Sequence, residues 1–120
     1  MPETTPEAAR VARASAKALA GEHGARIVAD VERELHAGAE DSEPDQYLDP
    51  VSLGALIVSA ATFAWQVYTD SRDRGKKPDS TTLARSVRIE LEDHSTEITA
   101  GTEHVITVVV QETLHRGDQP

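Results

Sequence analysis

Histidine and carboxylate side chains are the residues in this sequence that could bind a metal ion or transfer a proton. The chain contains five histidines and 21 acidic residues. The closest two histidines, His94 and His104, are ten positions apart, and neither an HExxH nor an HxxxH pattern occurs. The spacing therefore predicts no metal site and favours solvated histidines at helix ends and turns.

Other motifs that carry chemistry fail on specific residues. Asp70, Asp73 and Gly75 resemble part of a calcium-binding loop, but Arg72 places a cation where that loop needs an oxygen ligand. The sequence lacks a P-loop, a GxGxxG turn and a GxSxG elbow, and it has no cysteine. We therefore expect no catalytic residue, no cofactor, no small-molecule substrate and no enzymatic activity.

The charge and composition of the chain narrow its class further. A formal net charge of -9 would repel a phosphate backbone, and the 12 basic residues form no long stripe, so we expect no nucleic-acid partner. A length of 120 residues suits one domain. The first 40 residues contain no apolar run of signal-peptide type, which predicts a cytoplasmic start. Nine arginines against three lysines indicate a GC-rich bacterial source.

The amino-terminal part of the chain is expected to form two helices. Thr5 followed by Pro6 is a favourable start, because threonine can accept a hydrogen bond from a free backbone N–H and proline needs none at the first helical position. Gly21 and Gly24 then favour a break. Apolar residues at helical spacing predict a second helix over 25–36.

A single uncharged apolar helix over about residues 50–70 is the strongest feature of the sequence. Asp49 and Pro50 supply a capping residue and a first-turn proline, and no charge follows until Asp70. Its apolar side chains face every direction, so we expect the other helices to leave part of it uncovered. The candidate interface or membrane residues are Leu53, Leu56, Ile57, Ala60, Phe63, Ala64, Trp65 and Tyr68.

The carboxyl-terminal third fits two secondary structures. Residues 86–92 and 104–112 place apolar side chains on one helical face but also contain β-branched and alternating patterns. We favour helices, since Ser80 can cap the first segment and Thr102 with Glu103 can start the second. The predicted fold is mainly α around the apolar helix, and the alternative is α+β with a β-hairpin formed by the two segments.

These elements predict a simple domain organisation. An acidic stretch with five carboxylates and no base reads as a solvated linker between a front half and a back half. The expected parts are an amino-terminal helical segment (1–38), the acidic linker (39–49), the apolar helix with the carboxyl-terminal segment (50–116) and a tail (117–120).

A membrane-spanning role is the main alternative for the apolar helix, over about residues 51–69. Eighteen helical residues would span about 27 Å, against roughly 30 Å of hydrocarbon core. Basic residues follow this helix, which would place the carboxyl terminus in the cytoplasm and the protein in the inner (plasma) membrane. The same charge order also suits the dipole of any helix, so it does not separate the two readings.

The sequence thus predicts a small, acidic, non-enzymatic helical protein that serves in assembly or regulation. Its apolar helix would be both the core and the interface to another protein or to a second copy, with a cytoplasmic location. The alternative is a small single-pass membrane-anchored protein.

Overall fold

Five α-helices account for the residues that the computed structural model describes, which are 5–39, 53–93 and 100–117. No strand occurs in these ranges, so the mainly α prediction is confirmed and the alternative β-hairpin over 86–92 and 104–112 is wrong. In chain order the helices are α1 (Pro6–His23), α2 (Arg26–Ala39), α3 (Leu53–Asp73), α4 (Ser80–Asp93) and α5 (Ala100–Gly117).

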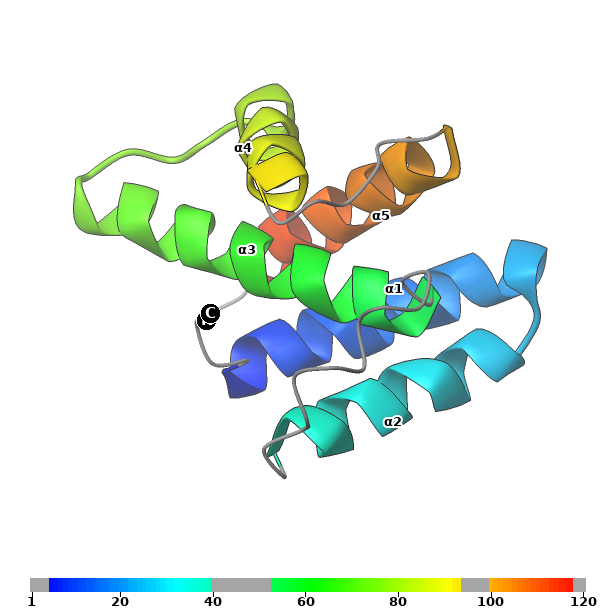
Figure 1. Cartoon of the computed structure of the whole chain (residues 1–120). Coiled ribbons are helices and arrows are strands. Elements are labelled where there is room, and N and C mark those ends of the chain that lie inside the picture. The colour runs from blue at the N-terminus through cyan, green and yellow to red at the C-terminus, as the bar shows by residue number, and fades with distance from the viewer. Residues whose placement is uncertain (1–4, 40–52, 94–99, 118–120) are drawn as a thin grey trace.

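Helices α1 and α2 form the antiparallel hairpin seen in Figure 1. The predicted start is confirmed: the hydroxyl of Thr5 accepts a hydrogen bond from the backbone N–H of Ala8 at 3.1 Å, with Pro6 in the first turn. The predicted break falls at Gly24, which has a φ of 87° and donates its N–H to the carbonyl oxygen of Ala20. Glycine adopts this left-handed conformation without steric cost, so the chain can reverse there.

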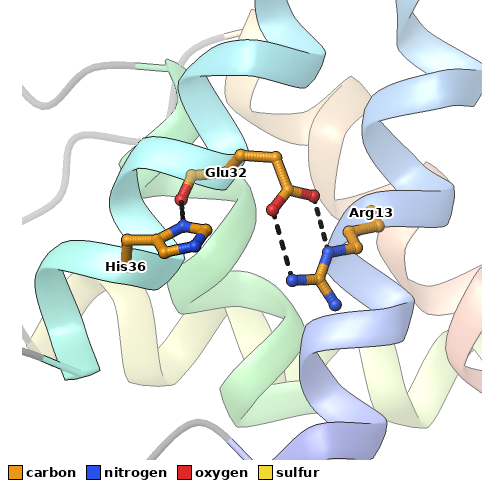
Figure 2. A network of polar contacts seen from close by, with 3 residues as sticks. All are labelled: Arg13, Glu32 and His36. Atoms are coloured by element: carbon orange, nitrogen blue, oxygen red, sulfur yellow. Dashed lines mark hydrogen bonds and ion pairs between the residues drawn. The ribbon is translucent and has the colours of Figure 1, made fainter.

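A bidentate ion pair on the surface joins the two helices of this hairpin (Figure 2). Nε and Nη2 of Arg13 in α1 donate to the two carboxylate oxygens of Glu32 in α2, at 2.6 and 3.2 Å. The hydrogen bond from Arg13 lowers the pKa of the Glu32 carboxyl. Nδ1 of His36 donates to the backbone oxygen of Glu32 at 2.7 Å. Because the pair is exposed to solvent, it fixes the alignment of the two helices more than it stabilises them.

Helix α3 is the central element, because it packs against each of the other four helices. In Figure 1 it crosses the molecule with the α1–α2 hairpin below it and α4 and α5 above it. Its predicted start at Asp49 and Pro50 lies outside the described residues, and its end at Asp73 comes later than expected. The core around it consists mainly of aliphatic side chains, which include Val11, Leu19, Val31, Ile57, Leu83, Val87, Leu91, Ile106 and Val109.

Small residues let the neighbouring helices approach α3 closely. A Cβ atom added to Gly54 would lie 2.8 Å from the backbone carbonyl carbon of Asp30 in α2. Ala60, Ala61 and Ala64 are fully buried on the same helix. Alanine and glycine at contact positions shorten the distance between helix axes, so backbones rather than long side chains meet there.

Helices α4 and α5 complete the bundle from the carboxyl-terminal third. Leu83, Val87 and Leu91 are buried at helical spacing, which explains why this segment is a helix although Ile89 also fits an alternating pattern. Ile89 points away from the core and is 50% exposed. Residues 94–99, which connect α4 and α5 in the sequence, lie outside the described residues.

The cap of α4 is Asp79 rather than the predicted Ser80. Its carboxylate accepts a hydrogen bond from the backbone N–H of Thr82 at 2.8 Å, and its carbonyl oxygen accepts from Leu83 at 3.0 Å. Both residue types cap helices well, and the proline before Asp79 fixes the entry of the chain. The sequence pattern therefore predicted the helix, but it placed the cap and the first helical residue one position too late.

We expect the cap of α4 to make stability depend on pH in the acid range. The hydrogen bond from the Thr82 backbone lowers the pKa of Asp79 from its ordinary value of 3.8. A carboxyl group with a lowered folded pKa stabilises the fold above the unfolded pKa, and this contribution is lost as the pH falls through the folded value. Denaturant titrations at neutral pH and near pH ~3 should show a smaller acid loss for Asp79→Asn than for the wild type. Equal acid losses would contradict the cap.

Candidate functional site

The eight candidate residues on the apolar helix divide into a buried and a partly exposed group. Leu53 and Trp65 are partly buried, near the start and in the second half of α3. The other six have at most 8% of their surface exposed, and they are Leu56, Ile57, Ala60, Phe63, Ala64 and Tyr68. The other four helices therefore cover most of α3, and Leu53, Val58, Trp65 and Val67 are the larger apolar side chains of this helix that stay partly exposed.

The partly exposed end of this group forms an aromatic and cationic array. The rings of Trp65 and Tyr68 stack with their centroids 5.6 Å apart and their planes at 23°. One turn further along α3, the guanidinium of Arg72 lies 5.7 Å from the centroid of the Tyr68 ring. Its Nη1 donates to the Tyr68 hydroxyl at 3.1 Å. These spacings of three and four residues bring the side chains onto one side of the helix.

The end of α5 completes the array from a distant part of the sequence. Nη1 of Arg72 also donates to the carbonyl oxygen of Gly117, at 3.3 Å. A Cβ atom added to Gly117 would lie 2.2 Å from Cζ of Tyr68, so only glycine lets the backbone of α5 lie against this ring. Arg72 therefore ties the last turn of α3 to the last turn of α5.

A pocket of about 350 Å³ lies over this array, and we call it the α3-end pocket. Its lining combines the two aromatic side chains with two arginines and two acids. Arg72 and Arg116 stand in the last turns of α3 and α5, where a positive charge also offsets the helix dipole. Glu7 stands in the first turn of α1, where a negative charge does the same. The lining residues are Glu7, Trp65, Tyr68, Thr69, Arg72, Asp73, Arg116 and Gly117.

Trp65 and Tyr68 were among the sequence candidates, whereas the other lining residues were not. Arg72 follows Tyr68 by four positions and Trp65 by seven, but the predicted helix ended at about residue 70, so the sequence did not place Arg72 on the same helix. Glu7, Arg116 and Gly117 had no local signal. They reach the pocket only because α1 and α5 both pack on α3.

A second pocket of about 320 Å³ lies between α4 and α5, and we call it the α4–α5 pocket. Ala84 of α4 and Val110 of α5 are its apolar residues. The remaining lining side chains are all polar or basic, and they are Ser80, Thr81, Arg85, Arg88, Thr107 and Gln111. Among the described residues, no acidic side chain lines this pocket.

Two of the described histidines, His36 and His104, form hydrogen bonds or ion pairs with other groups. His104 of α5 pairs with Glu22 of α1, with 2.9 Å between Nε2 and the carboxylate oxygen. His36 bonds the α2 backbone as described above. Among the described residues, no group of three or more histidine or carboxylate side chains is arranged so that it could hold a metal ion.

The length and apolar character of the helices bear on the membrane alternative. Within the described ranges, none of the helices combines the length and the apolar character that crossing a bilayer requires. Residues 51 and 52 of the predicted span lie outside these ranges.

Comparison with known proteins gives no relative for this fold and these pockets. The chain matches no protein-family model, no curated protein and no solved structure. The function must therefore be argued from the side chains of this chain alone.

Proposed function

We propose that this protein is a non-enzymatic interaction module that serves in assembly or regulation and contacts its partner through the α3-end pocket. The partner is another protein or a second copy of this chain. The proposal keeps the interaction role that the sequence predicts for the apolar helix. It moves the contact surface from the whole helix to the partly exposed Trp65 and its neighbours.

The observation that carries this proposal is the position of Trp65. It is the only tryptophan of the chain, and it is partly exposed, stacked on Tyr68 and close to arginine side chains. Tryptophan, tyrosine and arginine are the residue types that contribute most to binding at protein interfaces. Trp65 also packs against the core, so the ring is held on one side and open to a partner on the other.

Other apolar side chains of the described surface are partly exposed as well, and Val28, Leu35 and Val108 are examples. Ile89 is the only large apolar side chain classed as exposed among the described residues. A single exposed isoleucine is normal for a folded domain and does not form a patch. The α3-end pocket is the better candidate surface because it alone places the tryptophan beside arginine side chains.

We expect Trp65→Ala to weaken partner binding while Ile89→Ala leaves it unchanged. Truncation of a central interface tryptophan costs about 2 kcal/mol or more, which corresponds to roughly a 30-fold loss of affinity. Self-association of all three proteins can be measured by sedimentation velocity over a dilution series. Binding to another protein can be measured by comparing what the wild type and both variants retain from extracts of the source cells.

The comparison between variants decides the outcome. A partner or a dimer seen with the wild type and Ile89→Ala, but reduced with Trp65→Ala, would support the proposal. A chain that stays monomeric at all concentrations and retains the same proteins in all three forms would overturn it. Circular dichroism of Trp65→Ala would show that the helices are intact, so that lost binding is not lost folding.

A further inference from the structure

The α4–α5 pocket has a composition that suits a negatively charged group. Five of its lining side chains can donate a hydrogen bond to a ligand: two hydroxyls, one amide and two guanidiniums. The hydroxyl of Thr107 already donates to the backbone oxygen of Glu103 at 3.0 Å. The five donors come from both helices, so they approach the same space from two sides. The pocket, at about 320 Å³, falls in the size range of small-molecule sites.

Arg88 is held in place by an acid that lies outside the pocket lining. Its Nε and Nη2 donate to the two carboxylate oxygens of Glu103 in α5, both at 2.9 Å. This bidentate ion pair joins α4 to α5 beside the pocket. The bonds to Glu103 leave Nη1 of Arg88 available, so the guanidinium can donate to a second acceptor without losing its first.

Arg85 is exposed and supplies a cation that no neighbouring side chain neutralises by direct contact. No carboxylate of the described residues lies within ion-pair distance of its guanidinium. The nearby Asp79 is engaged with the backbone of Thr82 and is not part of the pocket lining. The helix end itself is therefore already capped, and the pocket lies along the side of α4.

The shape of the donor set favours a phosphoryl group over a carboxylate. A carboxylate offers two oxygens in one plane, whereas a phosphate monoester offers three terminal oxygens in different directions. Donors from Thr81, Arg85 and Arg88 on α4 and from Gln111 on α5 suit the second arrangement. Ala84 and the buried Val110 add an apolar contact for the organic part of such an ester.

We propose that the α4–α5 pocket binds the phosphoryl group of a phosphate monoester, with Arg85 as the principal charge and Arg88 as a pre-positioned second donor. This site is separate from the α3-end pocket, so it does not depend on the interaction proposed there. The bound ester would link α4 to α5.

The proposal is tested on the full chain by following backbone amide signals in NMR titrations. The probes are inorganic phosphate, phenyl phosphate and benzoate, each up to millimolar concentrations. We expect saturable shifts for residues of α4 and α5 around the pocket. Phenyl phosphate should bind more tightly than inorganic phosphate, because it adds the apolar contact, and both should bind more tightly than benzoate.

Variants separate a specific site from general charge attraction. Arg85→Gln should weaken phenyl phosphate binding about tenfold, since it removes a charge-assisted pair worth about 1.5 kcal/mol or more. Arg33→Gln removes the same charge from an α2 side chain that is 77% exposed, and it should leave binding unchanged. Absence of saturable shifts, equal binding of benzoate and phenyl phosphate, or equal weakening by both variants would overturn the proposal.

Discussion

Ile57→Ala is expected to lower the free energy of unfolding by about 2–5 kcal/mol, the usual cost of emptying a fully enclosed aliphatic site. Ile57 has no exposed surface and lies on the helix that all four others contact. The lost methyl groups leave a cavity that the surrounding backbone can close only in part. Urea denaturation followed by circular dichroism measures the change.

Ile89→Ala is the matched control for this substitution. The same atoms are removed from a side chain that is 50% exposed, so the change should stay within about 0.5 kcal/mol. The dependence of the unfolding midpoint on protein concentration tests whether Ile57 lies in the core or in a subunit interface. If Ile57 were in a subunit interface instead, the unfolding midpoint would move with protein concentration in the wild type and less so in the variant. Similar effects of the two substitutions would contradict the central place of α3.

Gly54→Ala is expected to destabilise the fold by about 1–3 kcal/mol, although alanine is the better helix former. The added Cβ would lie 2.8 Å from backbone atoms of Asp30, and a backbone cannot rotate out of the way as a side-chain tip can. Helices α2 and α3 must therefore move apart. Thermal or urea unfolding measures the loss.

Gly21→Ala is the matched control: the same substitution is expected to raise the free energy of unfolding instead of lowering it. Gly21 lies within α1, and no atom lies within 4 Å of the position that its Cβ would take. The substitution should therefore stabilise the protein by about 0.5–1 kcal/mol through helix propensity alone. If Gly54→Ala also stabilised the protein, the close approach of α2 and α3 would be wrong.

Much of the fold could be predicted because its signals are local. The threonine and proline at the start of α1, the glycine that ends it, and the uncharged run of α3 each act within a few residues. The carboxyl-terminal helices were harder, since Ile89 and the valines of α5 suit a strand as well as a helix. Burial of Leu83, Val87 and Leu91 on one helical face resolves that conflict.

The coverage of α3 and the composition of the pockets could not be predicted in the same way. Hydropathy shows how apolar a helix is, but not that four partners will surround it, because that depends on contacts between distant segments. Arg116 and Gly117 join Trp65 only through the packing of α5 on α3. In the second pocket, Arg85 and Gln111 are 26 positions apart in the sequence and meet only in the bundle.

The contacts of α3 also determine how the protein opens to solvent. Within the described ranges, α2 packs only on α1 and α3, and α4 only on α3 and α5. Either of these two helices can detach while α1, α3 and α5 keep their mutual contacts. Protection from hydrogen exchange should therefore be graded, with amide protons of α2 and α4 lost through partial opening. Those in the middle of α3 would exchange only when the whole bundle unfolds.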